Sequence, residues 1–425
     1  MAEAGAAARS RELVGRVAAC AAAAAGIAAG LAAATPAAAQ WRASAGAGAA
    51  AVYTWIDHAP GGSSLDEARL VHLVAMGHLE NPGRWLRVDG MLNLEGLTTP
   101  GGELTPGVFG EGFVDRRHPH TYLHELAVTA AAPGTAGFAA SATVGKGFVP
   151  FGTDDPMSRP VVRYPVNHHF AQILERAIVV GAVRRGPVAI EGSLFNGDEP
   201  EEPSSWPNLE RFGDSWAARV TVWPVAGVEA QVSRAIVKSP EHREGAGTTA
   251  RKWSASGRWE GSVARRPVYL LGEWARTSEA DGRFVYRSLL AEGAWTEGGR
   301  RLHYRFERTE RPEEERRTDP FRSVRPHHDD SNLGTTRWTI HTAGLTVRLP
   351  TSGPGPAVSG LFEVSRAGVH RLAGIVIDPD MFYGSSAIWS VTAGIRLELG
   401  APLHRMGRYG AATAMPGGAH THQHP

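Results

Sequence analysis

The stretch that decides the fold of this chain is Trp85-Leu86-Arg87-Val88-Asp89-Gly90-Met91-Leu92-Asn93-Leu94-Glu95. Its side chains alternate in character, so that one phase carries Leu86, Val88, Leu92 and Leu94 and the other carries Arg87, Asp89, Asn93 and Glu95. Successive side chains of a β-strand point to opposite faces. This two-residue period therefore predicts a strand with one apolar face and one charged face.

The same period recurs along most of the chain after Ser44. The strands it predicts lie at 49–57, 69–79, 84–96, 121–131, 137–147, 172–183, 187–196, 214–223, 227–237, 251–262, 267–277, 283–296, 300–309, 336–349, 357–367 and 387–399. We therefore expect an all-β chain of about 16 strands, with about 14–18 compatible with the pattern.

The lengths of the connections between these strands point to a particular all-β architecture. Short connections, such as 184–186 and 297–299, alternate with long ones, such as 148–171 and 310–335, and only 278–282 departs from the rule. Transmembrane β-barrels have short periplasmic turns and long extracellular loops. A soluble β-sandwich has no reason to alternate in this way. The pattern predicts a transmembrane antiparallel up-and-down β-barrel with both termini on the periplasmic side.

Two further features favour a barrel over a sandwich. The polar phase carries charges of both signs in mid-strand, which suits a water-filled lumen. Aromatic residues stand near strand ends, as in the girdles of membrane barrels; they are Tyr53, Trp55, Trp85, Tyr122, Trp216, Trp223, Trp253, Trp259 and Trp338.

The first forty residues read as an export signal rather than as part of the fold. A basic start at Arg9, Arg11 and Arg16 precedes an Ala-rich apolar run, and 35–39 (TPAAA) provides a small-residue cleavage site. We expect a Sec signal peptide at 1–39, a periplasmic N-terminal segment at 40–48, the barrel at 49–399 and a flexible His/Gly/Met-rich tail at 400–425. The alternative, a lipoprotein cleaved at Cys20, leaves too short an apolar run after Arg16.

Composition excludes several classes of protein. The single cysteine, Cys20, lies in the predicted signal, so the mature chain has none and no disulfide holds it. A formal net charge of +1 argues against nucleic acid as a partner. No later segment approaches the roughly 20 apolar residues of a membrane helix.

Several motifs resemble those of a largely uncharacterised, porin-like outer-membrane family of Gram-negative environmental bacteria. The segment 114–120 (VDRRHPH) is similar to that family's VDRQHPHD-like stretch, with Thr121 where the family has an acidic residue. Further matches lie at 192–197 (GSLFNG), 239–241 (SPE), 378–384 (DPDMFYG) and 406–410 (MGRYG). The resemblance implies a β-barrel in the cell outer membrane, with lipid, lipopolysaccharide and the barrel-assembly machinery as partners. Sixteen-stranded porins are often homo-trimers, which is a further expectation.

The third long connection predicts where such a channel narrows. In sixteen-stranded general porins this loop folds into the lumen, and here its segment 149–160 contains Asp154 and Asp155 among three prolines. Opposed rings of charge select ions at close range. The arginines expected to face these carboxylates across the bore are Arg87, Arg219, Arg258 and Arg305. The alternative is that Asp154-Asp155-Pro156 forms a surface turn.

Histidines mark candidate metal ligands, because closely spaced neutral imidazoles bind Zn or Cu. The strongest candidates are His118, His120 and His124, since Pro119 stiffens the first pair; the tail adds His420, His422 and His424. The alternatives are a structural role at a loop–strand junction for the first group and an unstructured metal-binding tract for the tail.

Signatures of catalysis do not occur in this sequence, which has no G-x-S-x-G, no H-E-x-x-H, no phosphate loop and no cysteine nucleophile after the predicted signal. We therefore expect no enzyme, but a porin-like channel for passive diffusion of small hydrophilic or ionic solutes. A metal-handling barrel and a closed structural barrel are the alternatives, followed by a soluble secreted β-protein.

Overall fold

The structure is a computed structural model that describes residues 41–58, 62–97, 120–132, 137–153, 156–200, 203–238, 249–313, 334–351, 355–373 and 378–413. Its strands are β1 (Arg42–Ile56), β2 (Leu65–Glu80), β3 (Leu86–Asn93), β4 (Leu123–Ala131), β5 (Phe138–Gly147), β6 (Arg176–Arg185), β7 (Val188–Phe195), β8 (Ser215–Val222), β9 (Val228–Lys238), β10 (Thr249–Val263), β11 (Arg266–Glu279), β12 (Phe284–Glu297), β13 (Arg300–Glu313), β14 (Gly334–Arg348), β15 (Ala357–Ala373) and β16 (Ala387–Gly400). Short helices occur at η2 (Glu95–Leu97), η3 (Pro156–Ser158), α3 (His168–Ala171), η4 (Leu209–Arg211), η5 (Ala280–Gly282), α4 (Pro379–Tyr383) and η6 (Gly410–Ala412).

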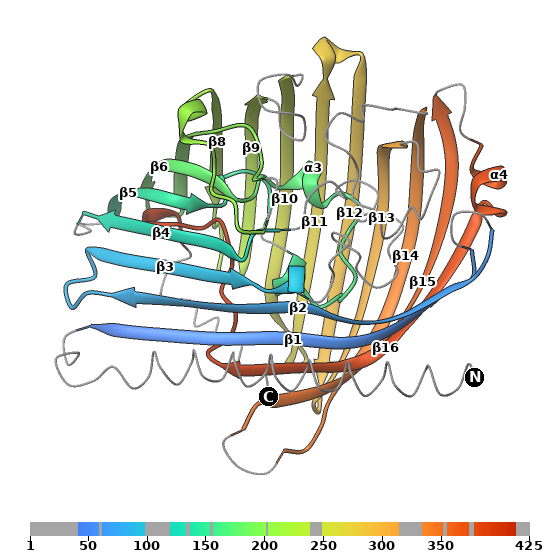
Figure 1. Cartoon of the computed structure of the whole chain (residues 1–425). Helices are drawn as coiled ribbons and strands as arrows, with labels where there is room; N and C mark the ends of the chain where they lie inside the picture. Colours follow the sequence, from blue (N-terminus) through green and yellow to red (C-terminus); the bar gives the residue numbers. More distant parts are fainter. Residues whose placement is uncertain are drawn as a thin grey trace.

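These strands form one closed antiparallel barrel (Figure 1). Each strand pairs with its neighbours in sequence, and β1 pairs with β16 from Gly46↔Gly400 to Ile56↔Ser390 to close the ring. The predicted fold class and the sixteen predicted strands are confirmed, with boundaries that shift by a few residues. None of the described helices is long and apolar enough to cross a membrane.

The connections alternate in length as predicted, which gives the barrel two different ends. Short turns, the start of β1 and the end of β16 lie at one rim, here called the turn end; the long connections lie at the other rim, here called the loop end. The exception expected at 278–282 is the short 3-10 connection η5 between β11 and β12.

Two predicted boundaries are wrong. The first strand begins at Arg42, so most of the expected periplasmic segment 40–48 belongs to the barrel. Ala and Gly dominate this part of β1 and show no apolar–polar alternation, which is why the pattern missed it. The expected flexible tail 400–425 is also wrong in part, because residues 401–413 lie inside the barrel and all of them except Pro402 are buried or half-buried; residues 414–425 lie outside the described part.

The two faces of the barrel differ in polarity as the alternation predicts. Leu302 on the outer face of β13 is 57% exposed, whereas Arg305 and Glu307 on the inner face are 0% and 1% exposed. Most of the predicted girdle residues are on the outside, but Trp338 is fully buried. It faces inward at the loop end, where it packs against Tyr383 and the interior is apolar.

One turn carries strain that a substitution should relieve. The hairpin between β10 and β11 has a two-residue loop in which Ala264 and Arg265 both have positive φ, of 49° and 64°. A left-handed conformation costs a non-glycine residue roughly 1–2 kcal/mol. We expect Arg265→Gly to raise the free energy of unfolding by about 1 kcal/mol, measured by reversible urea unfolding in lipid vesicles. A destabilised Arg265→Gly variant would contradict this account.

Candidate functional site

The third long connection lies inside the barrel, as predicted. Residues 148–175, here called the third loop, leave β5 at the loop end and return to β6, and they contain η3 and α3. Almost all of their described side chains are buried, including Phe151, Val162 and Tyr164. Figure 1 shows α3 within the outline of the barrel, and α3 contacts β11. The third loop therefore occupies part of the lumen.

Three glutamates on alternate wall strands hold this loop. Glu273, Glu307 and Glu363 lie on the inner faces of β11, β13 and β15, and each is at most 3% exposed. Glu273 accepts hydrogen bonds from the Asn167 amide at 2.6 Å and from the Thr153 hydroxyl. Since each carboxylate accepts hydrogen bonds from the loop, its buried charge is compensated.

The other two glutamates bind the middle of the loop. Glu307 forms an ion pair with Arg163 and accepts a hydrogen bond from the Val166 backbone N–H at 2.7 Å. Glu363 accepts one from the Val162 backbone N–H at 2.7 Å and lies 3.0 Å from His303 Nε2. Backbone N–H groups that would otherwise be buried without partners are thus satisfied by the wall.

A second set of contacts holds the first part of the loop against β8 and β9. The carbonyl of Gly152 accepts a hydrogen bond from Gln231 at 2.7 Å, and its N–H donates to the Ser233 hydroxyl at 2.9 Å. Gly152 has φ of 66°, and a Cβ there would lie 1.6 Å from the Ala171 carbonyl oxygen. Only glycine fits this close approach between the two arms of the loop.

The lumen also contains a segment that the sequence placed in the flexible tail. Residues 401–413, here called the C-terminal segment, leave β16 at the turn end and run to η6, which packs against β4, β5, β6 and β7 (Figure 1). Arg405 pairs with Glu229 at 2.8 Å, and Arg408 contacts the same carboxylate at 2.9 Å and Gln231 at 2.7 Å. Two cations therefore bind one wall carboxylate.

The C-terminal segment and the third loop contact one another inside the barrel. The Tyr409 hydroxyl accepts a hydrogen bond from the Phe148 backbone N–H at 3.0 Å. Met406 packs in one apolar cluster with Phe148, Met157 and Tyr164. The two segments consequently form a single packed body, held to the wall by ion pairs and hydrogen bonds.

The four arginines predicted at the constriction have carboxylate partners on the wall itself. Arg87 pairs with Asp89, Arg219 with Glu191, Arg258 with Glu260 and Arg305 with Glu292. Two of them also reach the loop, since Arg219 donates to the Gly152 carbonyl and Arg305 to the Arg163 carbonyl. Asp154 and Asp155 lie outside the described residues, so the charge pair across the bore stays a prediction.

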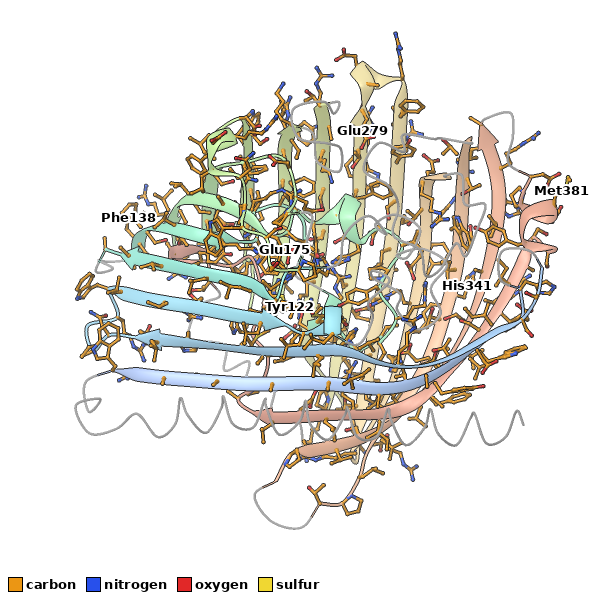
Figure 2. The ribbon with its side chains drawn as sticks, in the orientation of Figure 1. Tyr122, Phe138, Glu175, Glu279, His341 and Met381 are labelled. Atoms are coloured by element: carbon orange, nitrogen blue, oxygen red, sulfur yellow. The ribbon has the colours of Figure 1, made fainter. Side chains whose placement is uncertain are left out.

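Two of the predicted metal ligands meet at the end of the third loop. The side chains of His120, His124 and Glu175 are buried together, with ligand atoms all within 4.8 Å of one another. His124 Nδ1 lies 2.5 Å from Glu175 Oε1, and His120 Nδ1 lies 3.5 Å from Oε2. Figure 2 shows Glu175 in the middle of the molecule, far from Phe138 and Met381 at the rims. His118, His420, His422 and His424 lie outside the described residues.

The electrostatics of Glu175 follow from these neighbours. Burial opposes its ionisation, but the neighbouring imidazoles of His124 and His120, through their electrostatic attraction and hydrogen bonds, hold the pKa of Glu175 well below its usual range. The carboxylate also accepts hydrogen bonds at Oε1 from the Thr121 backbone N–H at 2.8 Å and hydroxyl at 2.7 Å. Glu175 is therefore an anion inside the barrel.

A pocket lined by arginines lies at the turn end of the inner wall. It has a volume of about 40 Å³ and is bordered by Arg301, Arg348, Arg396 and Glu398, together with threonine and serine side chains. The buried Nη2 of Arg396 has no hydrogen-bond partner in the structure. Three guanidinium groups against one carboxylate give this pocket an excess of positive charge, which suits a small anion.

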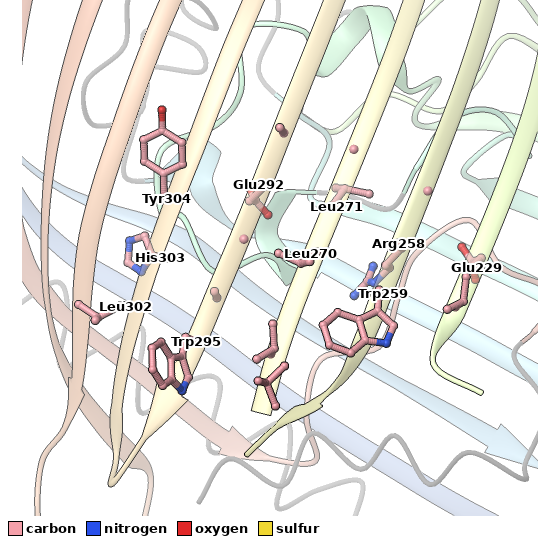
Figure 3. Close-up of a pocket in the computed structure, with 18 of the residues that line it drawn as sticks. Glu229, Arg258, Trp259, Leu270, Leu271, Glu292, Trp295, Leu302, His303 and Tyr304 are labelled. Atoms are coloured by element: carbon pink, nitrogen blue, oxygen red, sulfur yellow. The ribbon is translucent and has the colours of Figure 1, made fainter. Parts of the chain in front are cut away.

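The outer face carries an apolar groove of about 1040 Å³ over β9–β13, near the turn end (Figure 3). Its rim carries Trp259, Leu270, Trp295 and Leu302, and glycines such as Gly272 widen it between them. Trp295 and Leu302 are 51% and 57% exposed. Large apolar side chains exposed in this number are expected of a surface that faces lipid.

The sequence missed the three wall glutamates, Glu175 and the C-terminal segment. A signal existed for the wall glutamates, which fall on the inward phase of their strands, and for the C-terminal segment, since 406–410 (MGRYG) is a motif beyond the last strand; Glu175 had none. Alternation assigns a residue to a face but does not say what it touches. The contacts of Glu307, for example, join residues 141 and 144 positions apart.

Comparisons with known proteins give a likeness of fold alone. No family model matches the chain, and no curated protein matches its sequence. Among solved structures, an anion-selective porin from Comamonas acidovorans is 10% identical with a TM-score of 0.47, over 85% of this chain and 100% of that chain. Salmonella typhi OmpF in complex with daunomycin is 9% identical with a TM-score of 0.45, over 84% and 97%. Pseudomonas aeruginosa OpdO is 11% identical with a TM-score of 0.36, over 84% and 97%.

Proposed function

We propose that this chain is an outer-membrane channel through which small hydrophilic or ionic solutes diffuse passively. The observation that carries the proposal is the closed barrel with an apolar outer face, a charged inner face and a loop folded into its lumen. In a membrane, a closed barrel satisfies every backbone group of its strands. An inner wall lined by charged and hydroxyl side chains then favours water over lipid in the lumen. No residue performs chemistry in this function.

Planar bilayer recording tests the proposal. Purified protein, shown by circular dichroism to be folded, is added to a planar lipid bilayer in KCl. We expect stepwise increases of current, each the insertion of one channel. Folded, membrane-inserted protein that never conducts at any salt concentration would refute the channel and favour the closed structural barrel. Protein that stays in solution without detergent would refute the membrane location itself.

The arginine pocket predicts the sign of the ion selectivity. Neutralising Arg301 and Arg396 to Gln removes two positive charges from the inner wall while keeping hydrogen-bonding side chains in place. Because lumenal charges select ions by their field, we expect the reversal potential in a KCl gradient to shift toward cations.

Arg266 provides the matched control for that experiment. It lies at the turn end in an exposed pair with Glu297 at 2.6 Å, and its side chain is 44% exposed. Arg266→Gln should leave the reversal potential almost unchanged. A double Arg301→Gln/Arg396→Gln variant with the selectivity of the unmodified protein would show that the pocket lies off the ion path.

Three expectations from the sequence remain proposals alongside this one. They are export through a cleaved Sec signal, insertion by the barrel-assembly machinery, and assembly as a homo-trimer. Native mass measurement of the detergent-solubilised protein tests the last of these. The charge pair of Asp154 and Asp155 with the lumenal arginines is tested by Asp154→Asn/Asp155→Asn, which should shift selectivity toward anions.

A further inference from the structure

The cluster of His120, His124 and Glu175 lies inside the barrel but takes no part in the proposed passage of solutes. Its three side chains come from two elements that meet at the loop end: His120 and His124 at the start of β4, and Glu175 between the third loop and β6. They are 6%, 0% and 1% exposed. Two imidazoles and one carboxylate, buried together, form a set of ligands rather than a solvated surface.

The geometry points to a binding site for a divalent transition-metal ion of the zinc class, and we propose that His120, His124 and Glu175 hold it. Their ligand atoms lie within 4.8 Å of one another. Ligands that share one Zn²⁺ at about 2.0–2.2 Å each lie within that separation of one another. Two nitrogens and one carboxylate oxygen leave a further position for water. The proposal is independent of whether the barrel conducts.

Backbone strain at Glu175 supports a functional role for the cluster. Glu175 has φ of 57°, a left-handed conformation that a long side chain rarely adopts. Such strain persists only where the surrounding structure enforces it, and it concentrates at functional sites. Here the strained backbone turns the carboxylate toward the two imidazoles at the last residue before β6.

The side chains around the cluster form hydrogen bonds of the kind that orient the ligands of a metal site. The Thr121 N–H and hydroxyl both donate to Glu175 Oε1, which fixes the carboxylate and leaves Oε2 toward His120. Lys146 donates a hydrogen bond to the Thr121 hydroxyl, and Thr121 in turn links it to the cluster. Hydrogen bonds of this kind orient metal ligands in proteins. The Phe148 ring, 5.1 Å from that of His124, adds an apolar wall.

One buried nitrogen of the cluster is unsatisfied. Nε2 of His124 is buried and has no hydrogen-bond partner in the structure. A buried polar atom without a partner is unfavourable, and a bound ion, or a water that it carries, would supply the partner that the described residues do not give this nitrogen. The same ion would join the start of β4 to the end of the third loop and so stabilise the loop inside the lumen.

Zinc titration of the folded protein in detergent tests this site. The tail histidines are first replaced in the full chain, as His420→Ala/His422→Ala/His424→Ala, so that they cannot bind the added metal. Isothermal titration with ZnCl2 should then give one equivalent bound per chain. Adding His120→Ala or His124→Ala should abolish that equivalent, and Thr121→Val should weaken it by about 10–100-fold. His341→Ala, an exposed histidine on β14, is the matched control and should bind as before.

A second measurement guards against variants that fail to fold. Co²⁺ added to the tail variant should give visible absorption bands of a nitrogen–oxygen site, and these bands should be absent from Glu175→Gln with unchanged circular dichroism. The proposal is overturned if the folded tail variant binds no stoichiometric Zn²⁺. It is equally overturned if His120→Ala and His124→Ala both keep the bound equivalent.

Discussion

Truncation of the chain after Gly400 is expected to raise the single-channel conductance severalfold. The deleted part includes the C-terminal segment, which lies inside the lumen with Ala411 and Ala412 at most 6% exposed. Its removal takes away Arg405 and Arg408, whose side chains contact Glu229 and Gln231 on β9 and Thr221 on β8. Current through a water-filled barrel grows with the cross-section left open. The measurement is planar bilayer recording in KCl beside the full chain.

Truncation after Thr413 is the matched control for this prediction. It removes residues 414–425 but keeps every described contact of the C-terminal segment. We expect its conductance to equal that of the full chain. If truncation after Gly400 left the conductance unchanged in folded protein, the C-terminal segment would lie beside the ion path rather than in it.

A double variant distinguishes release of the C-terminal segment from its deletion. Tyr409 joins the C-terminal segment to the third loop through the Phe148 N–H, and Arg408 joins it to Glu229. Arg408→Ala/Tyr409→Ala removes both contacts while the chain keeps its length. An increase smaller than that of the truncation, accompanied by rapid current fluctuations, is expected because the segment then docks only part of the time.

The strands of this barrel could be predicted because alternation is a local property. In β13, Leu302 and Tyr304 face outward while His303 and Arg305 face inward, as the two-residue period requires. The two-residue period does not identify a strand where both of its faces carry small residues. Gly46 in β1 is needed because the chain after β16 passes close by: a Cβ there would lie 1.9 Å from the Ala401 carbonyl oxygen. That requirement becomes visible only when the two ends of the chain are brought together.

The inner site could be predicted only by its face and its position along the chain. The sequence placed the third loop in the lumen and His120 and His124 close together. It did not identify Glu175 as their partner, because that carboxylate is 51 positions from His124 and reaches it through a left-handed backbone. Ion pairs such as Arg163–Glu307 depend in the same way on how a long loop is folded. Periodicity says nothing of that folding.

Replacing Glu307 by Ala is expected to release the middle of the third loop and to change the current strongly. Glu307 is the carboxylate partner of Arg163, and both side chains are at most 3% exposed. It also accepts a hydrogen bond from the Val166 N–H. Removing one member of a buried ion pair costs about 3–5 kcal/mol. We expect the docked state of the loop to weaken by that order, with a higher mean conductance and frequent fluctuations.

Two readouts and one control make this prediction decisive. Limited proteolysis should cut Glu307→Ala within 148–175 and leave that segment of the unmodified protein intact, and bilayer recording should show the fluctuating current. Glu297→Ala is the control, because that residue pairs with Arg266 at the exposed rim, where a surface pair contributes about 0–1 kcal/mol. Glu307→Gln should be intermediate, since its amide oxygen still accepts from Val166 while the charge on Arg163 loses its partner. If Glu307→Ala conducts and resists protease as Glu297→Ala does, the wall glutamates do not hold the loop, and the third loop owes its place to packing with the C-terminal segment.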